Sequence, residues 1–260
     1  MSQPAWTDEL LDNPHAIADK RSRVQQMFSA IAPSYDHNNR LHSFWRDQAW
    51  RRKTVRLAQL KPTDTVVDVA CGTGDLTLAF TRALARLRRQ ESTTNPPAVL
   101  GIDFTYQMLP IAQTKSQRAS KNLPIHWFNG DAQALPLPDA CCDDVSISFG
   151  IRNVQQPMQA LREFRRVLRP GGRLLILAFS ERITPLIRTL NPFLTQKVMP
   201  LTATLISGDK SGAYKYLPRS IKSFIGREEM MQMMREAGFT DITPHPMTFG
   251  VCVCYRGFVR

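Results

Sequence analysis

The stretch from Val66 to Asp75 reads V-V-D-V-A-C-G-T-G-D, and it constrains the fold more than any other part of the chain. A β-branched run typical of a buried strand ends in Gly72 and Gly74, and a helical pattern begins at Leu76. Glycines at a strand-to-helix turn let the backbone come close to a ligand because they carry no Cβ. We therefore predict a ligand-binding turn in an α/β domain, with an ordinary tight turn as the alternative.

The acids around this turn indicate which ligand it binds. The next strand-like run ends in Asp103, where a carboxylate can accept both hydroxyls of a ribose. The dinucleotide fingerprint G-x-G-x-x-G is incomplete, because Thr77 occupies the place of its third glycine. S-adenosylmethionine has no pyrophosphate to place at a helix N-terminus, and Asp68 can hold its cationic amino acid end. The predicted cofactor is therefore S-adenosylmethionine rather than NAD.

The composition sets limits on the class of protein. A chain of 260 residues with 43% hydrophobic residues forms one large domain, or one domain with appendages. No apolar run approaches the roughly 20 residues that a membrane span needs, and the N-terminus shows no signal-peptide pattern. The five cysteines form no C-x-x-C pair, which favours a reducing cytoplasm over a disulfide framework or a metal site.

The net charge of +12, from 34 basic and 22 acidic residues, suggests an anionic partner. A nucleic acid or an acidic membrane surface would fit, and a solvated basic surface is the alternative for any single cluster. No aromatic residues interleave with the basic clusters as they do in a base-stacking platform, so we do not expect nucleic acid. The clusters include Arg46, Arg51, Arg52, Lys53 and Arg56.

Hydrophobic periodicity predicts alternating strands and helices. The predicted helices are 15–33, 43–59, 75–88, 106–120, 157–168 and 226–237, and the predicted strands are 64–70, 98–103, 125–129, 144–149, 173–179, 240–247 and 251–258. An R-P-G-G turn at 169–172 precedes the fifth strand, and Trp45, Trp50 and Leu57 are expected on the buried side of the second helix. This order is typical of a doubly wound, mostly parallel, Rossmann-like α/β sheet of seven strands.

The same pass along the chain predicts four parts. They are an N-terminal helical cap (1–60), a cofactor-binding core (61–182), a proline-containing helical lid (183–217), and a C-terminal helix with the last strands (218–260). The polar segment 90–97 is predicted to be an inserted loop. Ligands of such sheets bind beyond the carboxyl ends of the strands, where Gly72, Asp103, Asp131 and Ser148 fall.

Several motifs in this order resemble the quinone C-methyltransferases of menaquinone and ubiquinone biosynthesis, which are class I methyltransferases that use S-adenosylmethionine. The resemblance covers about Val24 to Gly257. The motifs are Y-D-x-x-N at 35–39, D-V-A-C-G-T-G-D at 68–75, D-A-x-x-L-P-x-P-D at 131–139, I-S-F-G-I-R-N-V at 147–154, R-V-L-R-P-G-G-R at 166–173, Y-x-Y-L-P-x-S-I at 214–221 and E-A-G-F at 236–239. I-S-F-G-I-R-N-V is the most specific of them.

The resemblance implies further cofactor contacts at Thr73, Asp103, Asp131, Ala132 and Ser148. Asp131 would lie near the adenine, although many family members have asparagine there. From the residues alone, Thr73 could equally be a turn residue, and Ser148 a buried hydroxyl bonded to backbone. The chain departs from the family at 45–48, where it reads W-R-D-Q instead of a Gly-x-His-Arg stretch that helps to shape the quinone pocket.

The chemistry implied by the resemblance transfers a methyl group to a ring carbon, which is nucleophilic once a ring hydroxyl is partly deprotonated. Arg152 and Asn153 are the best candidates for stabilising the oxyanion or orienting a water. Tyr35 and Asp36 are secondary candidates for orienting the substrate or accepting a proton. The alternatives are a surface ion pair for Arg152 and a packing role for Tyr35.

The leading interpretation is an enzyme that methylates demethylmenaquinol at the inner face of the cell membrane, where the basic cap meets anionic lipid. Methylation of the ubiquinone-pathway benzoquinol is a close alternative. An RNA methyltransferase and a non-catalytic scaffold for quinone synthesis are the others, and a homodimer is possible. The place of the Asn/Asp-Pro-Pro-Tyr run of many amino-methylating enzymes reads S-F-G-I at 148–151, which argues against amine methylation.

Overall fold

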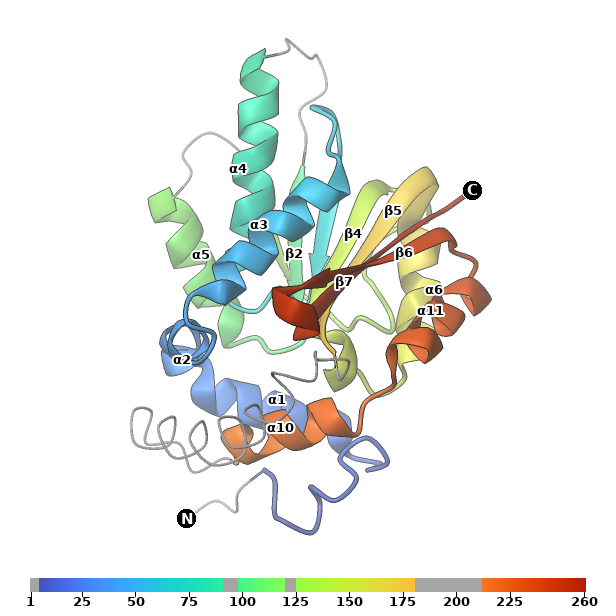
Figure 1. The fold of residues 1–260 in the computed structure, drawn as a ribbon. Helices are drawn as coiled ribbons and strands as arrows, with labels where there is room; N and C mark the ends of the chain where they lie inside the picture. The colour runs from blue at the N-terminus through green and yellow to red at the C-terminus, as the bar shows by residue number, and fades with distance from the viewer. Residues whose placement is uncertain (1–4, 91–97, 120–124, 181–211) are drawn as a thin grey trace.

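A seven-stranded sheet organises the protein (Figure 1). The computed structural model describes residues 5–90, 98–119, 125–180 and 212–260. The strands are β1 (Val66–Val69), β2 (Val99–Asp103), β3 (Ile125–Asn129), β4 (Cys142–Ser148), β5 (Leu168–Phe179), β6 (Thr240–Met247) and β7 (Cys252–Phe258). Their order is β3-β2-β1-β4-β5-β7-β6, and β7 runs antiparallel to both β5 and β6, whereas the other neighbouring strands are parallel. The predicted doubly wound, mostly parallel sheet is confirmed.

Helices cover both faces of the sheet, and a further group of helices lies beyond the strand ends (Figure 1). The α-helices are α1 (Lys20–Ile31), α2 (Tyr35–His42), α3 (Arg46–Ala58), α4 (Asp75–Gln90), α5 (Met108–Ala119), α6 (Pro157–Val167), α10 (Ala213–Lys222) and α11 (Arg227–Glu236), and the short 3-10 turns are η1 (Ala32–Ser34), η2 (Ile151–Asn153) and η4 (Thr248–Gly250). Helices α6 and α11 pack on one face in a core cluster, and α3 and α4 pack on the other.

The central strands are apolar along their length because both faces are covered. Val145 and Ile147 of β4 and Leu174 to Leu177 of β5 are fully buried. The parallel register places Asp68 of β1 opposite Gly101 of β2 and Ser146 of β4. The carboxyl ends of β1, β2 and β4 therefore meet at one edge of the sheet, as the sequence predicted.

Three local predictions need correction. The R-P-G-G segment is not a separate turn, because β5 already pairs with β4 at Leu168 and the extra residues bulge out before Arg173. The first helix begins at Lys20 rather than at residue 15, and the short helix α2 was not predicted. Trp45 is 66% exposed rather than buried, because it is the N-cap residue of α3, whereas Trp50 is buried as expected.

The N-terminal cap has a small core of its own. Its buried side chains include Trp6, Met27 and Ile31, and Tyr216 of α10 packs among them and stacks on Trp6 at 4.5 Å between ring centroids. The predicted lid at 183–217 lies mostly outside the described residues, and its predicted end falls inside α10. No helix in the described part of the chain has the length and apolar character to cross a membrane.

Candidate functional site

The glycine-rich turn joins β1 to α4 in a conformation that requires glycine. Gly72 has φ = +56° and Gly74 has φ = +82°, both in the left-handed region. A Cβ on Gly74 would lie 2.6 Å from the Trp127 ring. A Cβ on Gly72 would lie 3.8 Å from Cε1 of Tyr35, so the Tyr35 ring of α2 lies directly over the turn. The turn is thus packed between the sheet and the cap.

Two buried acids support the turn from below. The backbone N–H of Gly72 donates to Oδ2 of Asp103 at 2.7 Å, and the N–H of Thr105 donates to Oδ1 at 2.7 Å. Asp68 accepts hydrogen bonds from the hydroxyls of Thr77 (2.6 Å) and Ser146 (2.9 Å). Burial raises the pKa of each carboxyl to about 6. Unpaired burial of an anion is costly, so both sites favour a cationic or hydrogen-bond-donating ligand.

A small cavity opens at this turn. Its lining includes Asp68, Gly72, Thr73 and Ser148, together with Tyr35 of α2, Arg51 of α3, and Asp75. Oγ of Ser148 is buried and has no hydrogen-bond partner in the described part of the structure. A buried hydroxyl without a partner is unfavourable, so a bound ligand is the natural partner for it. The backbone-bonded alternative for Ser148 is therefore not what the structure shows.

A network of charges clamps the cap onto the glycine turn. The Thr73 hydroxyl donates to Oδ1 of Asp36 at 2.5 Å, and Nζ of Lys115 lies 2.7 Å from Asp36 Oδ2 and 2.5 Å from Asp75 Oδ1. Arg40 of α2 donates to Asp75 at 2.9 Å. We name these five residues the cap clamp. Asp36 and Thr73 therefore bond to each other, which the sequence did not predict, and Lys115 was missed because no motif contains it.

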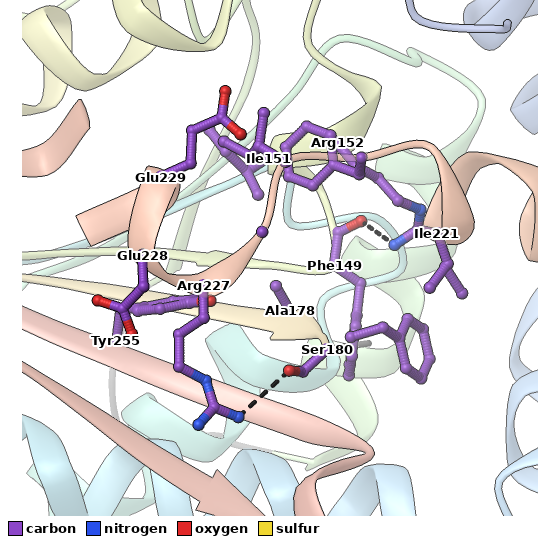
Figure 2. Close-up of a pocket in the computed structure, with 14 residues that line it drawn as sticks. Phe149, Ile151, Arg152, Ala178, Ser180, Ile221, Arg227, Glu228, Glu229 and Tyr255 are labelled. Carbon is purple, nitrogen blue, oxygen red and sulfur yellow. Dashed lines mark hydrogen bonds between the residues drawn. The ribbon is translucent and has the colours of Figure 1, made fainter. Parts of the chain in front are cut away.

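A second, larger cavity lies next to the end of β4, and Figure 2 shows the side chains that line it. It has a volume of about 310 Å³ and lies between the ends of β4 and β5 and the segment that joins α10 to α11. Its apolar lining is Phe149, Ile151, Ala178, Phe179, Ile221, Phe224 and Ile225, and its polar lining is Arg152, Ser180, Arg227, Glu228, Glu229 and Tyr255. Ser148 lines the small cavity and the next residue, Phe149, lines the large one, so the end of β4 separates the two.

Arg152 is the central charge of the larger cavity. It is only 8% exposed, its Nη1 donates to the carbonyl of Phe149 at 2.8 Å, and its guanidinium lies 5.7 Å from the centroid of the Phe179 ring. Burial lowers its pKa, and it forms no salt bridge with any described carboxylate. The surface ion pair that was the alternative for Arg152 is therefore absent from the described residues. The N–H groups of Arg152 that have no described partner suit an oxyanion.

The turn that carries Arg152 is fixed by two neighbours. Oδ1 of Asn153 accepts a hydrogen bond from the Tyr216 hydroxyl at 3.0 Å, so α10 holds η2 in place. Nζ of the fully buried Lys20 donates to the carbonyl of Val154 at 2.6 Å. Burial and the charge of Arg152 lower the pKa of Lys20 to about 8. Asn153 is thus placed to position Arg152, and it is not among the residues that line either cavity.

Four of the predicted cofactor contacts, Gly74, Asp103, Asp131 and Ala132, are not among the residues that line the small cavity. Asp131 accepts from the backbone N–H of Gln133 at 2.9 Å and pairs with Arg21 of α1 at 3.0 Å. Ala132 is buried in the core cluster. The residues at 45–48, expected to shape the quinone pocket, line neither cavity. The cofactor contacts that the family resemblance implies for Asp131 and Ala132 therefore stay predictions.

Comparison with known proteins adds an independent line of argument. The model of the ubiE/COQ5 methyltransferase family matches residues 16–259. A "Demethylmenaquinone methyltransferase" of Thermus thermophilus is 40% identical over 231 residues, which cover 89% of this chain and 99% of that protein. A "Ubiquinone/menaquinone biosynthesis C-methyltransferase UbiE" of Geobacter sulfurreducens is 37% identical over 243 residues, which cover 94% of this chain and 91% of that relative.

Solved structures share the fold at lower identity. A SAM-dependent methyltransferase of Thermotoga maritima, described as a possible histamine N-methyltransferase, matches with a TM-score of 0.61 and 20% identity. The match covers 91% of this chain and all of the other. At this identity the similarity concerns the fold, which hosts many different activities.

Proposed function

This chain belongs to the ubiE/COQ5 methyltransferase family, and on that premise we propose that it methylates a ring carbon of demethylmenaquinol to give menaquinol. It is an S-adenosylmethionine-dependent methyltransferase. The observation that carries the choice of an aromatic alcohol as substrate is the buried Arg152. It lies in a cavity lined by both apolar and polar side chains, and the end of β4 separates this cavity from the glycine turn.

The residues at the glycine turn fit S-adenosylmethionine. Ser148 offers a buried hydroxyl without a described partner, Asp68 and Asp103 offer carboxylates, and Arg51 offers a cation beside them. We propose that Arg51 faces the carboxylate of the cofactor, that Asp68 faces its ammonium group, and that Asp103 binds the ribose. When bound, S-adenosylmethionine supplies the electrophilic methyl group.

Arg152 has the properties needed to activate a quinol. A ring carbon becomes nucleophilic when a ring hydroxyl loses its proton, and the resulting oxyanion needs a nearby positive charge. The Arg152 guanidinium is held by the Phe149 carbonyl, and its side chain is only 8% exposed, so its charge is screened less by solvent than that of a surface arginine. It is a poor base itself because guanidinium remains protonated. We propose that Arg152 stabilises the phenolate and that Glu228 or Glu229, which line the same cavity, accepts a proton.

The lining of the larger cavity favours an apolar ring over a nucleic acid base. Phe149 and Phe179 pack at 4.7 Å between centroids, and Trp50 lies 6.0 Å from Phe149. Six of the apolar lining residues are aromatic or branched aliphatic side chains, which suit a naphthoquinol or a benzoquinol. The ubiquinone-pathway benzoquinol is therefore the second candidate substrate, and the names of several relatives mention both quinones.

The experiment that tests this function incubates the purified protein with methyl-labelled S-adenosylmethionine and either reduced demethylmenaquinone or the reduced methoxy-benzoquinone. We expect label in the naphthoquinol, identified by mass spectrometry. Label in the benzoquinol alone would assign the protein to the second substrate. Transfer to RNA with none to either quinol would overturn the proposal, as would tight cofactor binding with no turnover, which would indicate a scaffold.

We further propose a peripheral position on the cytoplasmic face of the cell membrane, because an isoprenoid quinol resides in the bilayer. The basic charge of the chain, +12 overall, supports this location. The possible homodimer stays a prediction, and size-exclusion chromatography with light scattering would test it.

A further inference from the structure

We propose that Phe44, Trp45 and Phe249, together with the basic side of α3, form a surface that docks into an anionic phospholipid bilayer. We name the three aromatic residues the aromatic tip. The proposal deepens the function above and rests on it, because a membrane-embedded quinol must reach the larger cavity. The enzyme would bind the bilayer by this surface and take its substrate directly from the lipid.

The aromatic tip is unusually exposed. Phe44 is 80% exposed, Phe249 is 70% exposed and Trp45 is 66% exposed. Isolated apolar residues on a surface are ordinary, but three large aromatic side chains from two connected loops are a reason to infer a partner. Aromatic side chains favour the boundary between head groups and acyl chains, and they are common in proteins that lie in that interface.

The backbone at the tip is strained in a way that presents these side chains. Phe44 has φ = +50°, Trp45 has φ = +62° and Phe249 has φ = +56°. Large L-residues rarely adopt this left-handed region, and the strain persists only where the surroundings enforce it. Asparagine or glycine would relieve it. Bulky aromatics at such positions therefore lower stability, and a binding role accounts for their presence.

Two hydrogen bonds hold the turn that carries Phe249 between α3 and the end of β5. Nε1 of Trp50 in α3 donates to Oγ1 of Thr248 at 2.8 Å, which joins α3 to the turn that carries Phe249. The N–H of Ser180, which lines the cavity, donates to the carbonyl of Val251 at 3.0 Å. Figure 1 shows this dark red turn η4 beside α3, at the strand ends. The turn that carries Phe249 therefore lies next to the end of β5, whose Ser180 lines the larger cavity.

The charge around the tip selects an anionic surface. The exposed charged residues of α3 are all basic, and its one acid, Asp47, is buried and paired with Arg51 at 2.6 Å. Basic residues close to a membrane of anionic lipid are attracted to its negative surface. The exposed basic residues are Arg46, Arg52, Lys53 and Arg56.

Vesicle co-sedimentation of the full-length protein tests the proposal, with vesicles of phosphatidylglycerol and phosphatidylethanolamine compared with pure phosphatidylcholine. We expect preference for the anionic vesicles and a drop in binding of at least about tenfold in the triple variant Phe44→Asn, Trp45→Asn, Phe249→Asn. Its melting temperature should not fall, because asparagine tolerates the left-handed backbone. Anionic vesicles should also shift the tryptophan emission to the blue, and Trp45→Asn alone should remove that shift.

A matched control removes exposed aromatics at the opposite edge of the sheet. Tyr106→Ser with Phe128→Thr alters side chains that are 62% and 40% exposed, and it should leave vesicle binding unchanged. Equal loss in the control and in the triple variant would overturn the proposal. Unchanged binding in the triple variant, or binding to RNA with none to vesicles, would also overturn it.

A second measurement separates this proposal from the proposed function. The triple variant should methylate a soluble short-chain demethylmenaquinol at the unmodified rate, because the tip lines neither cavity. Full activity on that quinol with no binding to anionic vesicles by the unmodified protein would overturn the docking surface alone. Vesicle binding through the tip with no activity on any quinol would overturn the function alone.

Discussion

A buried cation without a carboxylate partner is the residue-scale feature that most distinguishes this site. Arg152 keeps its guanidinium in the protein interior with one described hydrogen bond, from Nη1 to the Phe149 carbonyl, and Nε has no partner in the described part of the chain. Burying such a charge lowers stability, and buried charges of this kind are often found where a bound ligand supplies the opposite charge. Substrate binding would repay part of that cost when an oxyanion forms.

Replacing Arg152 should therefore separate activity from stability. In Arg152→Gln we expect kcat to fall about 100- to 1000-fold, because the oxyanion loses its charge partner. Cofactor affinity, measured by calorimetry, should change little. The melting temperature should stay the same or rise, because the variant no longer buries an uncompensated charge. Arg235→Gln, on the exposed side of α11, serves as the control. Full activity in Arg152→Gln would remove Arg152 from the mechanism.

Asp68 gives a second residue-scale prediction, this time for pH. Burial raises its pKa from 3.8 to about 6, so the folded protein binds this proton more tightly than the unfolded chain does. The carboxylate therefore costs stability increasingly as the pH rises from about 4 to about 6, and the full cost, about 3 kcal/mol at most, applies above that range. Below pH 4 the acid is protonated in both states and the cost disappears.

Asp68→Asn should consequently stabilise the cofactor-free protein at pH 7.5 and lose that advantage at pH 4. The amide can bond both hydroxyls that now contact Asp68, because Thr77 and Ser146 can rotate their O–H groups. Urea unfolding at several pH values, compared with the exposed control Asp12→Asn, checks this. Cofactor affinity should fall in the same variant. If the difference in unfolding free energy between Asp68→Asn and the unmodified protein did not change with pH, the burial of the charged Asp68 carboxylate would not be its cause.

The residue types at this site could be predicted from the sequence, but the side chains that they contact could not. The glycines, Asp68, Asp103 and Arg152 stand at motif positions whose chemistry is local. Lys115 lies in the middle of an ordinary helix, 42 residues after Thr73, and its contact exists only because α5 and α2 both reach the glycine turn. Hydrophobic periodicity along the sequence does not predict a contact between side chains of distant elements.

At the scale of elements, the cap clamp is the device that joins α2, α4 and α5 across the cofactor turn. The substitution Lys115→Met removes the positive charge of Lys115 from the cap clamp. It should weaken cofactor binding several-fold and speed limited proteolysis in α1 and α2, because the cap then opens more often. Arg118→Met, one turn further along α5 and exposed, is the matched control. Cofactor affinity by calorimetry and cleavage rates by mass spectrometry provide the readouts.

A double-mutant cycle makes the test of the clamp specific. Lys115→Met and Asp36→Asn remove opposite members of one ion pair, 2.7 Å apart. The two changes should therefore be less than additive, with a coupling of about 1 kcal/mol in unfolding free energy. Additive effects would mean that the two side chains act independently and that the ion pair between them does not stabilise the protein.

Elements with a strong pattern were predicted well, and those defined by tertiary contacts were not. Strand β3 was predicted at its observed bounds, and helices α6 and α11 within a residue at each end. The corner between α2 and α3 was missed, because Phe44 and Trp45 adopt backbone angles that no propensity favours. The bulge in β5 was read as a turn because R-P-G-G is a typical turn sequence, whereas pairing with β4 extends the strand through it.

At the scale of the whole molecule, the described side chains form three separate cores. Two lie on the faces of the sheet, and the third lies in the cap, around Trp6, Met27 and Tyr216. Near the glycine turn, the cap meets the sheet domain through the cap clamp and Tyr35. Apolar burial joins α3 of the cap to the sheet through Trp50 and Ala58, whereas polar contacts join α2 to the rim of the cofactor site. Polar junctions of this kind open at lower free energy than apolar cores.

Hydrogen exchange should reveal this division. In the free protein, amides of β4 and β5 should exchange only through global unfolding, because they lie at the centre of the sheet, whereas α1 and α2 should exchange at a lower free energy. Saturating S-adenosylhomocysteine should slow exchange in α1 and α2 by at least about tenfold, since we expect the ligand to occupy the small cavity that Tyr35 lines and to favour the closed cap. Equal slowing throughout the chain would indicate a single cooperative unit instead. Exchange in α1 and α2 that ignored the ligand would show that the cap takes no part in holding the cofactor.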